Sequence, residues 1–164
     1  ALSVAGCSQG TMNNVTFGDG EFGYYETVGG GSGAGNGFDG ASGVHTHMTN
    51  TRITDPEVLE HRYPVRLHRF AIRRNSGGGG RWRGGDGLIR EIEFLDSLEF
   101  SILSQHRVSA PFGMGGGGEG AVGRQFIVRA DGSRHELEGI DGCEVSPGDR
   151  LILETPGGGG YGKA

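Results

Sequence analysis

The side chains best suited to acid–base chemistry lie in one glycine-rich stretch, residues 24–50, which reads YYETVGGGSGAGNGFDGASGVHTHMTN. Glutamate and histidine are the residues that enzymes most often use to take up and release protons, so Glu26, His45 and His47 are the candidate catalytic residues. Glycine accepts positive φ and close approach of other atoms. A stretch this rich in glycine therefore predicts a shaped loop around these side chains, and neither a helix nor a regular strand.

His45 and His47 allow two interpretations. In an extended segment both imidazoles lie on one face, an arrangement that can bind a metal, with Glu26 or Asp39 as a third ligand. Alternatively, both histidines are hydrogen-bonding residues that line a pocket or brace the loop. Because no third ligand has a defined spacing, we prefer the second interpretation and assign no metal to this chain.

Short glycine motifs do not identify a nucleotide site. Residues 35–40 fit G-x-G-x-x-G, but they neither follow a hydrophobic strand nor begin a helix, and the chain contains no Gly-Lys-Ser/Thr. Residues 6–10 match the G-x-S-x-G pattern of a catalytic serine, yet turn-forming and β-prone residues follow where a helix is needed. Any nucleotide is therefore expected to bind to another part of the system.

The composition predicts one domain with a small hydrophobic core. The 164 residues include 36 glycines, and only 34% of the residues are hydrophobic, which favours short strands with tight turns over a helical bundle. The net charge of −5 argues against nucleic-acid binding. Residues 62–83, here called the arginine strip, hold 7 arginines and no acidic residue. The strip either faces an anionic partner or, as we prefer, forms the solvated outer faces of strands.

The sequence also leads to expectations about the cellular compartment of the protein and about whether the chain is a fragment. Two cysteines without metal-ligand spacing favour a reducing cytoplasm. No apolar run approaches the ~20 residues that span a bilayer, so no membrane interaction is expected. The chain starts at Ala1 without a methionine, which suggests a fragment of a longer protein.

Local signals predict a mainly β fold. A helix is expected to begin at residues 54–57, where Asp55 or Thr54 can cap it, and to end before Pro64. The apolar pattern after Pro64 changes phase once, which predicts a bulge near His68. Further strands are expected at 88–95, 98–103, 126–129, 134–138 and 151–154, with a hairpin turn at Asp131-Gly132. The expected fold is a sandwich or barrel of short strands with long glycine-rich loops and one short helix.

Four long motifs resemble one known family. YYETVGGGSGA, VHTHMTNTRITDPEVLEHRYPV, SGGGGRWRGGDGLIREIEF and ETPGGGGYG occur in the order and with the spacing typical of the C-terminal part of the hydantoinase B and 5-oxoprolinase family. The resemblance covers nearly all of residues 1–164, so we expect a single C-terminal domain or fragment. Within it, residues 1–63 would hold the glycine-rich site loops and the short helix, and residues 64–164 the β-rich part.

The resemblance implies ATP-dependent hydrolysis of a cyclic amide such as 5-oxoproline or a hydantoin. In this family a separate A subunit or A half is understood to bind ATP and Mg and to activate the ring carbonyl, and the B part couples activation to ring opening by water. Related acetone carboxylases use a metal, whose ligands we would place in a missing N-terminal region. We expect an oligomer, and we expect the isolated fragment to be inactive. The alternatives are a non-catalytic assembly module of the same complex, or part of an acetone-carboxylase-type enzyme.

Ring opening needs a base, an acid and donors for the developing oxyanion. Glu26, His45 and His47 are the candidates for proton transfer, with their individual roles left open. Backbone N–H groups between Gly29 and Gly33 are candidates for an anion nest. The residues predicted to bind substrate are Gly30, Gly31, Ser32, Gly33, Thr49 and Asn50.

Overall fold

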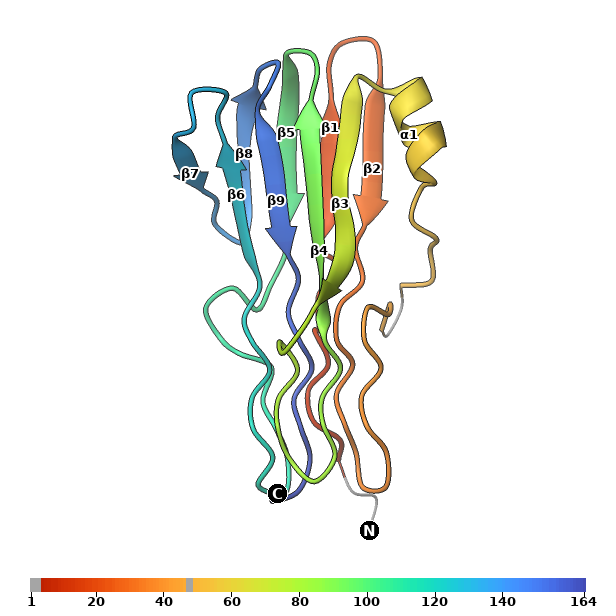
Figure 1. Ribbon diagram of the computed structural model, residues 1–164, viewed down its shortest axis with the longest axis vertical. Helices are drawn as coiled ribbons and strands as arrows, with labels where there is room; N and C mark the ends of the chain where they lie inside the picture. Colours follow the sequence, from red (N-terminus) through yellow and green to blue (C-terminus); the bar gives the residue numbers. More distant parts are fainter. Residues whose placement is uncertain (1–3, 47–48) are drawn as a thin grey trace.

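Regular strands and glycine-rich segments occupy two different halves of the molecule. The computed structural model describes residues 4–46 and 49–164. A two-layered β-sandwich forms one end of an elongated molecule, and extended glycine-rich segments run side by side to the other end (Figure 1). The predicted mainly β fold with one short helix is confirmed, and its two separate sheets make it a sandwich.

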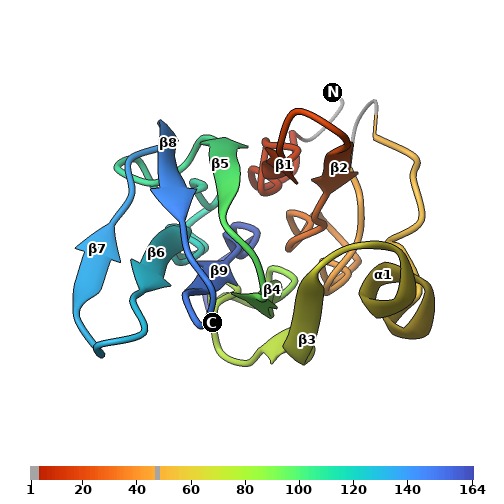
Figure 2. The same ribbon diagram turned by 90° about the horizontal axis from the view of Figure 1, so that it is seen from above.

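The two layers are antiparallel sheets that face each other (Figure 2). The four-stranded sheet has the order β2-β1-β5-β8, with β1 at Asn14–Gly18, β2 at Gly23–Thr27, β5 at Leu98–Leu103 and β8 at Ile140–Val145. The five-stranded sheet has the order β3-β4-β9-β6-β7, with β3 at Val65–Arg73, β4 at Gly87–Phe94, β6 at Arg124–Val128, β7 at Arg134–Glu136 and β9 at Arg150–Glu154. Since β1 pairs with β5, residues before and after position 63 build one sheet.

Alternate residues of strands such as β4 and β5 form the core between the sheets. In β5 the buried residues are Leu98, Phe100 and Ile102, and the residues between them are exposed. The same period of two places Ile92 and Phe94 of β4 in the core, because successive side chains of a strand point to opposite faces. Each fully buried side chain of this kind contributes about 1.5–3 kcal/mol.

Helix α1 (Pro56–Arg62) matches its prediction. Asp55 accepts a hydrogen bond from the backbone N–H of Glu57 at 3.0 Å, and Pro56 occupies the first turn. The chain becomes extended at Tyr63, the residue before Pro64. Leu59 is fully buried, whereas its neighbour Val58 is exposed. The helix therefore closes the edge of the sandwich beside β3 mainly through one side chain (Figure 2).

Other local predictions have mixed outcomes. The β3–β4 register shifts between Leu67 and Arg69, which confirms the bulge near His68. The β6–β7 hairpin turns through Gly132, whose φ of 85° favours glycine. The strands β1, β2 and β8 are absent from the set expected from the sequence. β2 lies within the stretch that was expected to be an irregular loop, and β8 lacks a strong apolar alternation.

The glycine-rich half is a bundle of extended segments joined by backbone hydrogen bonds. Residues 157–160 donate to four distant carbonyls, from Gly157 to Ala121, Gly158 to Gly85, Gly159 to Cys7 and Gly160 to Gly118, at 3.1, 2.8, 2.8 and 2.9 Å. Donors three residues apart, Gly157 and Gly160, thus reach the same neighbouring segment. This period of three is that of a polyproline II helix, so the predicted loops are packed, regular segments.

Close packing explains the closing GGGG motif. A Cβ atom would lie 1.9 Å from the oxygen of Ser76 at Gly157, 1.9 Å from Ser32 at Gly158, 2.0 Å from Phe112 at Gly159 and 2.2 Å from Gly79 at Gly160. These distances are far below van der Waals contact. Residues 157–160 are therefore glycine because neighbouring backbones occupy the space of a side chain.

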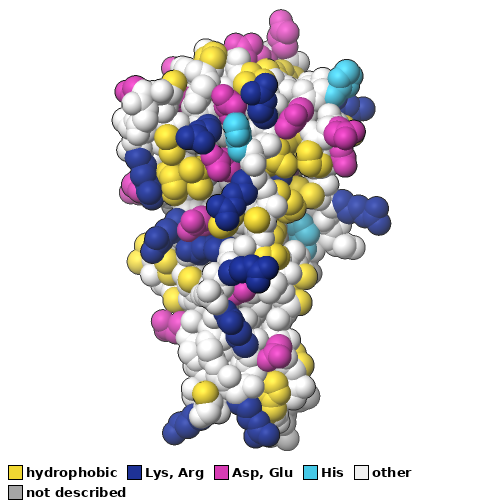
Figure 3. Space-filling model, viewed as in Figure 1, with side chains coloured by type: hydrophobic (Ala, Val, Ile, Leu, Met, Phe, Trp, Pro, Cys, Tyr) yellow, Lys and Arg dark blue, Asp and Glu magenta, His cyan; other side chains and the backbone are white. Residues whose placement is uncertain are grey.

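The arginine strip lies on a surface where both charge signs are interspersed (Figure 3). Arg66 pairs with Glu93 at 3.8 Å, Arg73 with Glu154 at 3.0 Å and Arg83 with Asp86 at 3.4 Å. These pairs favour the interpretation of the strip as outer strand faces and their flanks. No helix among the described residues is long and apolar enough to cross a bilayer.

Candidate functional site

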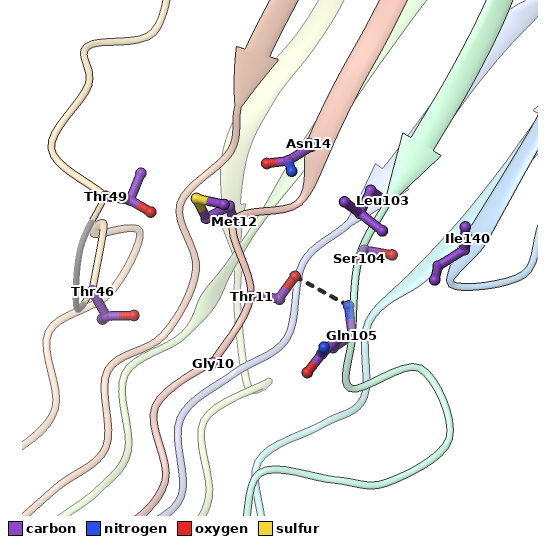
Figure 4. Close-up of a pocket in the computed structure, with 10 residues that line it drawn as sticks. All are labelled: Gly10, Thr11, Met12, Asn14, Thr46, Thr49, Leu103, Ser104, Gln105 and Ile140. Atoms are coloured by element: carbon purple, nitrogen blue, oxygen red, sulfur yellow. Dashed lines mark hydrogen bonds between the residues drawn. The ribbon is translucent and has the colours of Figure 1, made fainter.

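A pocket of about 340 Å³ lies where the four-stranded sheet meets the glycine-rich bundle (Figure 4). Its walls come from the approach to β1, the end of β5, the start of β8 and the segment that carries the candidate histidines. The lining residues are Gly10, Thr11, Met12, Asn14, Thr46, Thr49, Leu103, Ser104, Gln105 and Ile140. The volume suits a small organic molecule.

The pocket has an apolar rim. Met12, Leu103 and Ile140 are large apolar side chains that the fold leaves exposed. All three line the pocket, although they come from three different parts of the chain. Exposed apolar side chains that gather around a hollow mark a binding surface, because leaving them in water is unfavourable.

The polar wall of the pocket contains a buried side-chain oxygen that has no hydrogen-bond partner among the described residues. Thr11 Oγ1 accepts a hydrogen bond from the backbone N–H of Gln105 at 3.1 Å (Figure 4). Asn14 is 9% exposed, and its buried Oδ1 has no hydrogen-bond partner in the described structure. Buried polar atoms nearly always have a partner, so a ligand or a water molecule is expected to serve Asn14.

His45 directly precedes the lining residue Thr46 in the sequence and is not itself a lining residue. Its ring is half-buried, and its Nδ1 atom is buried without a hydrogen-bond partner in the part of the chain described. Burial lowers the pKa of His45, because it disfavours the charged imidazolium. A neutral imidazole can accept a proton, as a general base must. His47 lies outside the described residues, and catalytic roles for both histidines stay predictions.

The predicted binding residues divide into two groups. Thr49 lines the pocket, whereas Asn50 is exposed and is not among the lining residues. Residues 30–33 lie inside the bundle, and their N–H groups are already used. Gly30 donates to Val44 O, Gly31 to Pro156 O, Ser32 to Ala41 O and Gly33 to Ser8 Oγ, at 2.9–3.0 Å.

These hydrogen bonds decide whether residues 30–33 could bind an anion or the phosphates of ATP. An anion nest or a phosphate cradle needs backbone N–H groups that are free to turn toward the ligand. The N–H groups of residues 30–33 would first have to break their bonds within the bundle. This segment therefore does not fit the triphosphate of ATP, and a direct contact between residues 30–33 and substrate stays a prediction.

Glu26 lies away from the pocket, in the core of the sandwich. Its carboxylate accepts two hydrogen bonds from Arg90, Nε to Oε1 at 2.6 Å and Nη2 to Oε2 at 2.9 Å. Tyr24 donates its hydroxyl proton to Glu26 Oε2 at 2.7 Å. Burial raises the pKa of Tyr24, and the adjacent Glu26 carboxylate adds to this effect. These contacts make Glu26 part of a buried bridge between the sheets, and its proposed catalytic role stays a prediction.

Metal binding by this stretch gains no support from the described side chains. Asp39, one possible third ligand, accepts a hydrogen bond from the backbone N–H of Arg83 at 2.6 Å. Within residues 4–46 and 49–164, no three His, Cys, Asp or Glu side chains are arranged to hold a metal ion. Because His47 is outside these ranges, the paired-histidine alternative is untested.

Several pocket residues were not predicted. Asn14, Leu103 and Ile140 are far apart in sequence and meet only because β1, β5 and β8 are neighbours in one sheet. Thr46 was overlooked between the two histidines. The histidine segment itself was the only sequence signal that led toward the pocket.

Comparison with known proteins identifies the family. A sequence model described as hydantoinase B/oxoprolinase matches residues 1–164. The chain is 55% identical over 162 residues to 5-oxoprolinase 1 of Arabidopsis thaliana, a match that covers 99% of this chain and 13% of that relative. The chain thus spans only a small part of the length of such relatives.

Solved structures share the fold. An ATP-dependent caprolactamase from Pseudomonas jessenii superposes with a TM-score of 0.77 at 26% identity, over 98% of this chain and 30% of that one. A nucleotide-free acetone carboxylase gives a TM-score of 0.76 at 16% identity, over 98% and 26%, which shows likeness of fold alone. With motifs, fold and family match in agreement along the whole sequence, the chain belongs to the hydantoinase B/oxoprolinase family.

Proposed function

We propose that this chain is part of an ATP-dependent hydrolase that opens a cyclic amide, with 5-oxoproline or a hydantoin as substrate. One observation carries the proposal, namely the family match over residues 1–164 together with 55% identity to a 5-oxoprolinase. The fold shared with an ATP-dependent caprolactamase supports the same reaction class, since caprolactam is also a cyclic amide.

The chain would contribute binding and proton transfer. Water adds to the ring carbonyl carbon and loses a proton to a base, and the ring nitrogen leaves after it gains a proton from an acid. His45 suits the base, because burial keeps its imidazole neutral. His47 is the proposed second proton-transfer residue, and Thr49 is proposed to contact the substrate.

ATP and Mg would be held by an A-like subunit or half. The bonded N–H groups of residues 30–33 support this division, because they leave no ready phosphate cradle in that segment. The A-like part would therefore be the partner of this chain. The active complex would be an oligomer in which both parts contribute to turnover.

The test is turnover by the full-length protein together with its A-like part. Incubation with ATP and 5-oxoproline should form glutamate, ADP and inorganic phosphate, and a parallel reaction with hydantoin identifies the preferred ring. His45→Ala should lower kcat at least about 100-fold, the usual contribution of a proton-transfer residue. Failure of the wild-type complex to open either ring in an ATP-dependent way would refute the proposal.

A second candidate is a non-catalytic assembly module within the same enzyme. The observation that favours it is the structural use of Glu26, whose carboxylate is buried against Arg90. In that case His45→Ala and His47→Ala would leave kcat unchanged in a folded complex. The same variants thus discriminate between the two candidates.

A further inference from the structure

The pocket at the end of β1 combines a free carboxamide with an apolar rim. Asn14 forms part of its wall, and the exposed side chains of Met12, Leu103 and Ile140 surround it. Asn14 has no part in the proton transfer that is proposed for His45 and His47. Its unpartnered Oδ1 nevertheless calls for a donor, because burying an unbonded polar atom costs free energy.

A carboxamide is complementary to one particular edge of a lactam. A small ring forces its amide into the cis form, which places N–H and C=O side by side on one edge. The asparagine carboxamide likewise presents an acceptor oxygen and an NH₂ donor side by side. Two antiparallel hydrogen bonds can therefore join the two groups, whereas an open-chain trans amide presents only one of its groups in each direction.

The position of Asn14 permits this pairing. Its side chain lies at the pocket wall between Met12 and Leu103 (Figure 4). The oxygen is shielded in this structure, so pairing requires the carboxamide to rotate about χ2. Within residues 4–46 and 49–164, no hydrogen bond to Oδ1 opposes that rotation.

The rest of the pocket matches the rest of a lactam. Ring methylene groups are apolar and would cover the Met12, Leu103 and Ile140 side chains, which are otherwise in contact with water. Thr46 and Thr49 form the opposite side of the pocket (Figure 4). Both belong to the segment that carries His45, the proposed base, and Thr46 directly follows it in the sequence.

We infer that this pocket binds the lactam ring of the substrate, with the Asn14 carboxamide paired to the ring N–H and C=O. The inference rests on the proposed function for the identity of the ring. It adds a binding residue and a specificity rule, namely that the ring nitrogen must carry a hydrogen.

The first experiment measures binding to the full-length protein without ATP. The probes are 2-pyrrolidone and N-methyl-2-pyrrolidone, in which a methyl group replaces the ring N–H hydrogen that Asn14 would recognise. Wild type should bind 2-pyrrolidone about tenfold more tightly, as expected for loss of the paired hydrogen bonds. Asn14→Leu, which keeps the size of the side chain, should remove this preference.

Thr16→Val is the matched control. Thr16 is exposed and lies two residues further along β1, so it faces the same side of the sheet as Asn14 but does not line the pocket. It should retain the full preference for 2-pyrrolidone. Asn14→Asp provides a polar variant of the same shape that still accepts from the ring N–H but cannot donate to the ring carbonyl. It should bind both probes more weakly while keeping a preference for 2-pyrrolidone, which tests the pairing even if Asn14→Leu folds poorly.

Turnover by the complete enzyme separates this inference from the proposed function. Asn14→Leu and Asn14→Asp should raise the KM for 5-oxoproline about tenfold and change kcat less than KM. The inference would be overturned if both variants kept the wild-type KM, or if wild type bound the two probes with equal affinity. ATP-dependent ring opening by wild type would still support the proposed function in either case. Absence of ring opening by wild type would instead refute the function, and the binding probes would still test the pocket.

Discussion

A buried ion pair joins the two sheets and offers a quantitative test of the fold. Glu26 on β2 and Arg90 on β4 lie 64 residues apart in the sequence, and their side chains are 4% and 1% exposed. The guanidinium donates two hydrogen bonds to the carboxylate, at 2.6 and 2.9 Å. Such paired geometry is the condition under which burial of both charges is tolerated.

Removing one partner should be far more costly than removing both. Arg90→Met would leave the Glu26 carboxylate without a counter-charge in the core, and Glu26→Leu would leave the guanidinium. Each change should lower the free energy of unfolding by about 3–5 kcal/mol. The double variant replaces the pair with apolar side chains of similar volume, so it should recover most of that loss.

Urea denaturation of the full-length protein, followed by hydrogen exchange of the β2 and β4 amides, measures these changes. The control is Arg150→Met, because Arg150 contacts Glu91 at 2.7 Å on the same sheet but is 41% exposed. It should cost less than about 1 kcal/mol. If Arg90→Met were no more harmful than Arg150→Met, or if the double variant lost as much as the sum of the single changes, the buried pair would not hold the sheets as argued.

Three further predictions concern the bundle, the histidine segment and the helix. Gly158→Ala places a Cβ 1.9 Å from Ser32 O and should cost several kcal/mol in thermal or urea unfolding, whereas Gly79→Ala, which meets no atom within 4 Å, should be nearly neutral. Because burial lowers the pKa of His45, its neutral form contributes stability that is complete above pH 6.5 and is lost as the pH falls below that value. The free energy of unfolding of wild type and of His45→Gln should be compared between about pH 5 and 8, where histidine titrates. This free energy should change less with pH in the variant. Asp55→Ala removes the helix cap and should cost about 1 kcal/mol, with weaker protection of the α1 amides in hydrogen exchange.

The elements that sequence predicts correctly are those with local causes. Asp55, Pro56 and Pro64 define the helix through capping and through the missing proline N–H. Alternating apolar residues define β4 and β5, and the Asp131-Gly132 pair defines the β6–β7 turn. Each of these signals acts within a few residues, so no knowledge of the rest of the chain is needed.

The glycine-rich segments could not be predicted in the same way. A glycine that gives the backbone freedom and a glycine that lets another backbone approach look identical in one sequence. Only the partners distinguish them, and the partners of Gly158, for example, are Gly85 and Ser32. The candidate site was half predicted for the same reason, because Thr49 belongs to the recognised segment but Asn14 and Leu103 arrive through sheet pairing.

Two of the glycines that were expected to bind substrate, Gly30 and Gly31, are hydrogen-bonded to segments that lead into the pocket. Gly30 exchanges two hydrogen bonds with Val44, two residues before Thr46 on one wall, and Gly31 O accepts from the N–H of Gln9, which precedes Thr11 on the other wall. Adjacent residues of one bundle segment therefore hold both walls. A Cβ at Gly30 would come within 2.1 Å of Gln9 Oε1, so a side chain there would push the walls apart. Substitution of Gly30 should consequently impair ligand binding at the pocket whether or not its backbone touches the substrate, and only the Asn14 variants report on direct contact.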